Sequence, residues 1–349
     1  MHKETNELHP NTNVILEEAQ KIIKEGNIEA WIDFDKRSIV RDFDDYTEVK
    51  DTLDVWFDSG VTHQTVLKDR GIDETADLYL EGSDQHRGWF QSSLITSHAI
   101  NNKSPYKNVL THGFVVDAEG QKMSKSVGNI ISPQRIIKDK GADILRMWVA
   151  MTDYTKEMTI SEEIIKRVSE SYRRIRNTSK FLLSNINDFD VNEFNQSNLL
   201  ALDKWIIHKA EEMNKQIQSD YEEFRFNKIM KDVINFCTLE LGGYYLDIIK
   251  DRLYTSKSDG IPRCSAQMTC YVLMRYINSW SAPILTFTAE EIYSKIPNCK
   301  ESIYLDDWFS YSLDIDDKSV ELFDSLYEIK SDVSLSLIHI SEPTRRLNI

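Results

Sequence analysis

Short apolar runs alternate with glycine-containing turns and helix-forming segments through the middle of the chain. Residues 78–80 have the length and apolar character of a buried parallel strand. Gly82 then allows backbones to approach closely, and Ser83 or Asp84 can cap a helix over about residues 85–100. A strand, a tight turn and a helix start in this order predict a ligand site at the carboxyl end of the strand.

A second strand and two more helices follow the same pattern. Residues 108–116 predict a strand that ends in a turn containing Gly113, and Ser132 followed by Pro133 marks a helix start. Residues 141–148 open another helix. Strands that alternate with helices predict a parallel α/β sheet, and the adjoining loops favour a nucleotide site.

From about residue 160 the pattern becomes entirely helical. Apolar residues recur at helical spacing between residues 161 and 185, which predicts a helix with one buried face. Further helices are expected at about 200–220, 224–251, 262–281 and 288–295. The chain is therefore expected to be α/β first and all-α afterwards.

Four cations of the first of these helices lie within one stripe beside its apolar face. They are Lys166, Arg173, Arg176 and Lys180, at offsets of 7, 10 and 14 residues from the first. A solvated helix face and a stripe that contacts RNA phosphates are about equally favoured by this spacing alone.

The first 50 residues are polar and mixed, and they say little about function. Residues 13–24 predict an amphipathic helix, with Val14, Ile15, Ala19, Ile22 and Ile23 on its apolar side. Residues 28–48 suggest a small irregular subdomain.

Composition excludes several classes of protein. The chain has 349 residues, a net charge of −15 and no apolar run long enough to cross a bilayer. The charge argues against indiscriminate coating of nucleic acid, although a local basic stripe can still bind RNA. The four cysteines form no C-x-x-C pair and have no histidine at zinc spacing, so they predict reduced thiols in a cytoplasmic protein and no metal site.

A polar loop follows the second predicted strand. It reads Lys-Met-Ser-Lys-Ser over positions 122–126, with Gly128 and Asn129 suited to the dihedral angles of a tight turn. Lysines are mobile point charges that can follow a phosphate, and serine hydroxyls add donors. Without context, such a string is as often an ordinary surface loop.

Two aromatic segments add a possible apolar pocket. Trp56 lies in Asp-Val-Trp-Phe-Asp-Ser-Gly at 54–60, and Trp89 closes Glu-Gly-Ser-Asp-Gln-His-Arg-Gly-Trp at 81–89. Packing of the two aromatic residues is the competing interpretation. Asp84 could equally be a simple helix cap, and His86 a surface histidine.

Together these segments resemble the isoleucyl members of the class I aminoacyl-tRNA synthetase family. The lysine loop matches the KMSKS signature of the class, and residues 79–90 have the form typical of the isoleucine members. Residues 51–60, 110–114 and 141–148 agree as well, and the resemblance runs from about residue 10 to about 330. It implies the C-terminal half of a class I Rossmann-type catalytic domain, followed by an α-helical anticodon-binding bundle.

The resemblance implies a role for each matching position. Glu81 is expected to contact the isoleucyl-adenylate, and Gly82, Asp84 and Gln85 to line its adenosine side. Trp56 and Trp89 are expected to shape the apolar pocket, and His112 to border the adenine. Lys125 and Ser124 are expected to bind the ATP phosphates, with Lys122 assisting. The resemblance also makes the tRNA stripe Lys166, Arg173, Arg176 and Lys180 the favoured interpretation of those cations.

The implied reaction is that of an isoleucine–tRNA ligase. ATP with Mg2+ activates L-isoleucine to isoleucyl-adenylate, and the acyl group is then transferred to tRNA(Ile). The protein is expected to be a monomer that does not bind a membrane. In-line attack on the α-phosphate needs positioning and charge stabilisation more than a covalent nucleophile. A valyl-type ligase of the same class is the alternative.

The resemblance is incomplete at both ends. The H-I-G-H signature, most of the editing insertion and the zinc-binding tail of many relatives have no counterpart in this sequence. The expected division is a remnant of the editing junction at 1–50, the catalytic half at 51–155 and the anticodon-binding domain at 156–330. Residues 335–349 resemble a translated sequencing adapter, and a genuine apolar C-terminal segment is the alternative. The chain alone is therefore expected to be an inactive partial enzyme, at most a tRNA-binding module.

Overall fold

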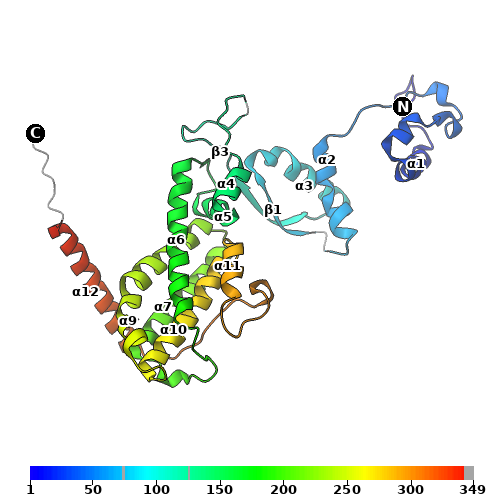
Figure 1. Cartoon of the computed structure of the whole chain (residues 1–349). Coiled ribbons are helices and arrows are strands. Elements are labelled where there is room, and N and C mark those ends of the chain that lie inside the picture. Colours follow the sequence, from blue (N-terminus) through cyan, green and yellow to red (C-terminus); the bar gives the residue numbers. More distant parts are fainter. Residues whose placement is uncertain (73–74, 125, 342–349) are drawn as a thin grey trace, which may run out of the picture. The chain divides into compact units, whose positions relative to one another are not determined.

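The structure, a computed structural model, describes residues 1–72, 75–124 and 126–341, without the side chains from 334 onward (Figure 1). The chain divides into two compact units. The first comprises Met1–Tyr79 with Asp84–Val109, and the second Leu80–Ser83 with Leu110–Ile349. Each unit is considered by itself.

The N-terminal part of the first unit contains the predicted helix in a longer form. Helix α1 (Thr12–Asp33) changes direction at Asn27, whose φ of 71° is left-handed. Two short 3-10 turns follow, η1 (Lys36–Ser38) and η2 (Phe43–Asp45). The predicted apolar face is only partly correct, because Ala19 is buried whereas Val14 is 63% and Ile23 38% exposed.

The rest of the first unit is built around a helix and a pair of strands. It contains α2 (Val55–Gly60), η3 (His63–Lys68), α3 (Trp89–Asn101) and most of η4 (Ser83–Arg87). It also contains the first four residues each of β1 (Ala76–Gly82) and β2 (Tyr106–His112), whose last three residues belong to the second unit. Strands β1 and β2 pair, and they run parallel because both begin at the same end: the Ala76 amide donates to the Pro105 carbonyl and Lys107 contacts Asp77. The predicted strand–helix–strand unit is therefore present.

Two details of this unit correct the sequence-based expectation. Strand β1 is not buried on both faces, since Tyr79 is 4% exposed but Leu80 is 51% exposed. Successive side chains of a strand alternate between faces, and only the face of Tyr79 packs on α3, where its hydroxyl bonds the Ser93 hydroxyl at 2.9 Å. The following helix also begins late, at Trp89, without a side-chain cap from Ser83 or Asp84.

The α/β part of the second unit is small. Strand β3 (Val115–Val116) pairs in parallel with β4 (Met158–Thr159), and the helices α4 (Pro133–Lys140) and α5 (Ala142–Met151) lie between them in the sequence. The predicted starts at Pro133 and near Gly141 are confirmed. The predicted strand 108–116 is not continuous, because β2 ends at His112 and β3 pairs with a different partner.

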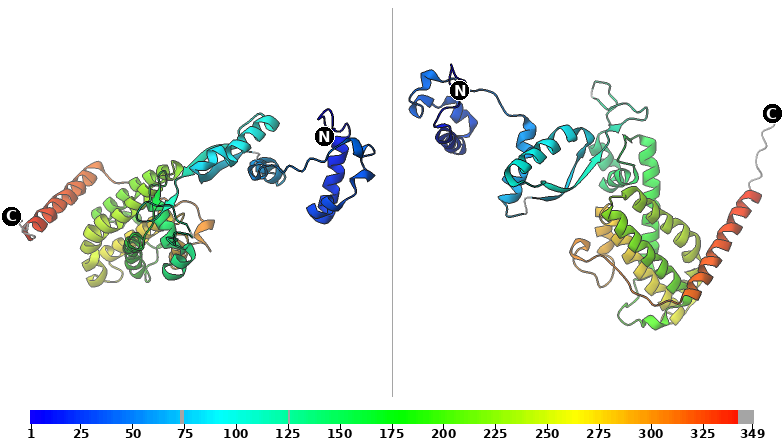
Figure 2. Two further views of the ribbon diagram at one scale, coloured as in Figure 1. Left: turned by 90° about the horizontal axis from the view of Figure 1, so that it is seen from above. Right: turned by 180° about the vertical axis from the view of Figure 1, so that it is seen from behind.

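The remainder of the second unit is a helical bundle (Figures 1 and 2). The all-helical prediction is confirmed, and the four expected helices after residue 200 are present; the expected 224–251 helix appears as three consecutive helical segments with a π-helical stretch in the middle. The bundle consists of α6 (Glu162–Ser184), α7 (Ala201–Glu222), α8 (Phe226–Asn235), η6 (Phe236–Tyr245), α9 (Leu246–Thr255), α10 (Ile261–Ser281), α11 (Thr286–Tyr293) and α12 (Asp317–Ser341), with short 3-10 turns η5 (Gln196–Asn198) and η7 (Ile303–Leu305).

The core of the bundle follows the predicted periodicity. On α6 the residues Ile165, Val168, Ile175 and Leu182 are all buried, at most 6% exposed. Burial of each such side chain stabilises the fold by about 1.5–3 kcal/mol. Helix α10 is buried along most of its length and is the centre of the bundle.

No helix of the described part of the chain is both long and apolar enough to cross a membrane. The backbone of α12 continues as a helix to Ser341. The assignment of residues 335–349 to a sequencing adapter stays a prediction, and residues 342–349 lie outside the described residues.

Candidate functional site

The loop that carries the KMSKS string is organised around Ser124. The Ser124 amide donates to the side-chain oxygen of Asn129 at 2.9 Å, and its carbonyl accepts from the Gly128 amide at 3.1 Å. Gly128 has a φ of 77°, as the sequence predicts for a tight turn, but Asn129 does not have a positive φ. Asn129 contributes its amide side chain instead of a left-handed backbone.

Asp117 anchors this loop and was not anticipated from the sequence. Its carboxylate accepts from the Asn129 amide at 2.7 Å and from the backbone amides of Gln121 and Glu119 at 2.8 and 3.1 Å. These bonds, that of Asn129 first, lower the pKa of Asp117 below its ordinary value. The only signal in the sequence is an aspartate three residues before Gly120, which has a φ of 77° and completes the turn.

Lys122 is the one lysine of the signature whose position is described, since Lys125 lies outside the described residues. Its backbone bridges to Val116, and its Nζ lies 5.1 Å from the centre of the Phe114 ring. A cation–π contact of this kind stabilises by about 0.5–1 kcal/mol at an exposed site. Lys122 is itself exposed, so its ammonium group is oriented by Phe114 and still accessible to a ligand.

His112 and Gly113 form the turn that separates β2 from β3. The Gly113 amide donates to the Tyr154 carbonyl at 2.8 Å, and a Cβ at this position would lie 2.0 Å from the Lys156 carbonyl oxygen. Only glycine fits this close approach. The His112 Nδ1 lies 2.9 Å from the Gly113 carbonyl and must donate to it, so the Nε2 of the neutral ring is left as an acceptor.

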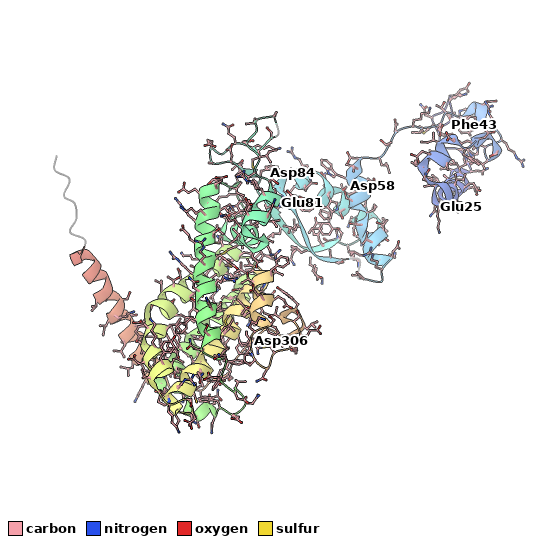
Figure 3. The ribbon with its side chains drawn as sticks, in the orientation of Figure 1. Glu25, Phe43, Asp58, Glu81, Asp84 and Asp306 are labelled. Carbon is pink, nitrogen blue, oxygen red and sulfur yellow. The ribbon has the colours of Figure 1, made fainter. Side chains whose placement is uncertain are left out.

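Glu81 and Gly82 end strand β1. The Glu81 side chain is exposed (Figure 3), and its Oε1 accepts only a weak bond from the adjacent Gly82 amide at 3.2 Å. Gly82 is buried. An exposed carboxylate beside a buried glycine at a strand end can accept a hydrogen bond from an amino group or a ribose hydroxyl.

Trp56 and Trp89, the aromatic pair, lie on the neighbouring helices α2 and α3 of the first unit. That they form two walls of one pocket stays a prediction. The Trp89 indole donates to the Ser59 carbonyl at 2.7 Å, and the Ser92 hydroxyl donates to the Trp56 carbonyl at 2.6 Å. Trp89 also stacks on Tyr79 with 4.5 Å between ring centres. Helix α2 is thus held on α3 through its carbonyl groups, and Trp56 keeps 41% of its surface exposed.

Gln85 and Asp84 lie beside this aromatic pair. The Gln85 side-chain oxygen accepts from the Trp89 amide at 3.2 Å, and a Cβ on Gly88 would lie 2.6 Å from that oxygen and 2.9 Å from the Trp56 ring. Gly88 therefore lets Gln85 and Trp56 approach each other. Asp84 is exposed (Figure 3) and accepts from the Gln85 amide group at 3.1 Å, so it is not the helix cap considered above.

The four cations of α6 do not form one uniform stripe. All four are exposed, but Arg176 and Lys180 line a groove against α11, whereas Lys166 lines a different hollow beside Arg135 and Glu162. Arg173 lines neither of these two. Arg176 also has a partner, Glu291, at 3.7 Å.

Two of the four cysteines lie in surroundings that disfavour the reactive thiolate. Cys237 and Cys270 are buried, and burial raises the pKa of Cys237 to about 12. Within the described ranges, no group of three or more His, Cys, Asp or Glu side chains could hold a metal ion.

Two family models match this chain. Residues 1–161 match the class I tRNA synthetases of the I, L, M and V group, and residues 203–336 match the anticodon-binding domain of tRNA ligases. The first match contains the lysine loop and the aromatic pair, and the second contains α7 to α11.

Curated relatives agree with both models. The chain is 53% identical over 312 residues to the isoleucine–tRNA ligase of Vesicomyosocius okutanii and 51% identical over 315 residues to that of Coxiella burnetii. These alignments cover 88% and 89% of this chain and 33% and 34% of the relatives. The chain thus spans about a third of the length of the curated relatives it matches.

Solved structures show the same fold at lower identity. A ternary complex of LeuRS, tRNA and LeuAMS from Agrobacterium radiobacter K84 matches 78% of this chain and 34% of that chain, with a TM-score of 0.59 and 18% identity. The methionyl-tRNA synthetase of Mycobacterium tuberculosis in complex with methionyl-adenylate matches 62% of this chain and 43% of that chain, with a TM-score of 0.50 and 21% identity. The two family models and the identity of about half of the aligned residues to the curated relatives show that the chain belongs to the class I tRNA synthetases.

Proposed function

We propose that this chain is part of an isoleucine–tRNA ligase, which activates L-isoleucine with ATP and Mg2+ and transfers it to tRNA(Ile). The observation that carries the proposal is the identity of about half of the aligned residues to isoleucine–tRNA ligases over 88% of the chain. A monomer in the cytoplasm is part of the same proposal.

The residues of the lysine loop keep their predicted roles in this proposal. Lys125, with Lys122 assisting, stabilises the charge that develops on the ATP phosphates, and Ser124 keeps the loop in a turn through its bonds to Asn129 and Gly128. Preorganised cations cost little rearrangement when the α-phosphate is attacked. The lysine loop therefore contributes electrostatic stabilisation and no covalent intermediate.

The isoleucine side chain of the adenylate is proposed to lie against Trp56 and Trp89. Trp56 and Trp89 supply apolar surface for the isoleucine side chain, Glu81 accepts from the adenylate, and Gly82, Asp84, Gln85 and His112 line the adenosine. A hydrophobic pocket separates isoleucine from valine by only about 1–3 kcal/mol. Identity to isoleucine–tRNA ligases, and not the pocket itself, supports isoleucine over valine.

A chimera tests this function. This chain replaces the homologous segment of the Coxiella burnetii relative, and isoleucine-dependent ATP–pyrophosphate exchange is measured. Exchange with isoleucine is expected, and Lys125→Ala should reduce its rate at least about 100-fold, the typical effect of removing one electrostatic stabiliser. Lys231→Ala, on the exposed face of α8, serves as the matched control.

Two outcomes would contradict the proposal. ATP–pyrophosphate exchange with valine but not with isoleucine would indicate the valyl-type alternative. An unchanged exchange rate in Lys125→Ala would contradict the proposed role of Lys125 at the ATP phosphates. The chain by itself is proposed to lack exchange activity, because it spans a third of the relatives' length, and to act at most as a tRNA-binding module.

A further inference from the structure

Helices α6 and α11 enclose a groove in the second unit. It has a volume of about 190 Å³ and is lined by Arg176 and Lys180 from α6, by Thr288 and Glu291 from α11, and by Lys295 just after α11. Lys295 was not anticipated from the sequence, because it lies more than a hundred residues from the α6 cations.

The charge of the groove is opposite to that of the whole chain. Three cationic side chains and one carboxylate line it, whereas the chain carries a net charge of −15. A concentrated positive charge on an acidic protein attracts anions locally and does not promote indiscriminate binding. The groove is therefore suited to one phosphate or a short run of phosphates.

The cations of this groove are available to a ligand. No carboxylate oxygen of the described residues lies within the 4.0 Å ion-pair distance of Lys180 or Lys295. The Arg176 pair with Glu291 is long, at 3.7 Å, and both side chains are more than half exposed, at 52% and 65%. Exposed pairs of this kind contribute about 0–1 kcal/mol, so an incoming phosphate can displace Glu291 at small cost.

A series of hydrogen bonds connects Arg176 to the core of the second unit. The Arg176 guanidinium contacts the Tyr172 hydroxyl at 3.4 Å, which bonds the Thr288 hydroxyl at 2.9 Å. The Thr288 hydroxyl in turn donates to the buried carboxylate of Asp143 at 2.6 Å. Asp143 is 6% exposed and also accepts a hydrogen bond from the Thr288 amide at 2.7 Å. This series of hydrogen bonds therefore ends on a carboxylate that is fixed in the core.

We propose that the groove between α6 and α11 binds a phosphate of the RNA backbone, with Arg176, Lys180 and Lys295 as its cations. Tyr172 and Thr288 are positioning residues for Arg176. This inference rests on the proposed function, since the RNA is the tRNA substrate, and it replaces the predicted stripe: Lys166 and Arg173 are not part of the groove.

The test measures binding of a tRNA(Ile) transcript by the full chain at several salt concentrations. Lys180→Ala and Lys295→Ala should each weaken binding several-fold and lower the slope of log K against log[salt] by about 1, the change expected for one lost phosphate contact. Lys231→Ala is the control. Glu291→Gln should tighten binding, because it removes the competing carboxylate without changing side-chain size.

Tyr172→Phe distinguishes the positioning role from simple loss of charge. It keeps the ring and all charges, so the salt slope should stay near the wild-type value while affinity falls a few-fold. In the Arg176→Ala background the same change should have no effect. Melting temperatures of all variants confirm that the fold is intact.

If tRNA still binds and neither Lys180→Ala nor Lys295→Ala changes the affinity or the salt slope, the groove is not a phosphate site. This outcome would leave the proposed function intact. Absence of any tRNA binding would also contradict the phosphate site. The exchange reaction of the chimera does not depend on tRNA contact by this groove, so that assay separates failure of the groove from failure of the proposed function.

Discussion

Asp203 is a fully buried carboxylate in the helical bundle. Its side chain has no exposed surface and accepts two bonds from Arg252, at 2.7 and 2.8 Å, and one from the Tyr245 hydroxyl at 2.6 Å; the Ser265 hydroxyl also donates to it. The carboxylate thereby connects α7, α9 and α10. A buried charge of this kind is tolerated only because every lone pair finds a donor.

We predict that Asp203→Ala lowers the free energy of unfolding by about 3–5 kcal/mol. The substitution leaves the Arg252 guanidinium, which is 18% exposed, without its carboxylate, and an uncompensated buried charge costs this much. Urea denaturation followed by circular dichroism measures the change. Asp251→Ala, at an exposed position of α9, should change stability by less than about 0.5 kcal/mol, and equal losses in both variants would contradict the role of the buried carboxylate.

At the scale of elements, the turn between α7 and α8 is held by a second buried carboxylate. Asp220 closes α7 with a fully buried side chain, and it accepts from Arg225 at 2.7 Å and from Lys228 at 2.6 Å. Phe224, between the two helices, has a φ of 56°, which is costly for a residue with a bulky side chain. The ion pairs compensate for this strain and fix the angle at which α8 leaves α7.

The stability of this turn should depend on pH. Burial raises the pKa of Asp220, but the bonds from Lys228, Arg225 and Gln216 outweigh it, so the folded-state pKa lies below the ordinary value of 3.8. A lowered pKa means that the stabilisation is complete above about pH 4 and is lost as the pH falls through the folded-state pKa.

We therefore expect Asp220→Asn to lower the melting temperature at neutral pH, and this difference from the wild type should shrink as the pH is lowered from about 5 to about 2. Differential scanning calorimetry at several pH values measures it. Asp251→Asn should show no such convergence, and a difference that stays constant with pH would show that Asp220 is not the titrating group.

At the scale of the whole molecule, the two units differ in how much apolar surface they bury. Of the described hydrophobic residues, the first unit buries Ala19, Val40, Tyr79 and Phe90, whereas the core of the second unit extends from Ile136 to Ile296. Segments with few buried apolar contacts open at low free energy. The catalytic-type segment from 110 to 161 belongs to the well-packed unit, together with the bundle.

We predict that backbone amides of α1 and α3 exchange with solvent at least about 10-fold faster than those of α7 and α10, corresponding to about 1.4 kcal/mol or more of opening free energy. Hydrogen exchange followed by mass spectrometry measures the difference. Uniform protection of all four helices would show that the two units unfold as one. Addition of a tRNA transcript should slow exchange in α6 and α11 but not in α1.

The sequence by itself determined the family, the order of α/β and helical parts, the helix starts at Pro133 and near Gly141, and the core face of α6. These follow from local rules, namely periodicity, capping and motif spacing. It could also predict that Gly128 occupies a left-handed turn. It could not predict that β2 and β3 pair with different strands, or that Leu80 is exposed, because pairing and burial depend on neighbours distant in the chain.

Only the tertiary structure decided how the polar side chains are grouped. Asp143 supports Arg176 through Thr288 and Tyr172, and Lys295 joins Lys180 from a turn more than a hundred residues away in the sequence. Such contacts depend on where whole elements pack, and no local spacing encodes them. Three of the four predicted cations of α6 are therefore divided between two hollows. In the lysine loop, the sequence predicted the turn at Gly128 but not the anchoring carboxylate of Asp117, 12 residues before Asn129.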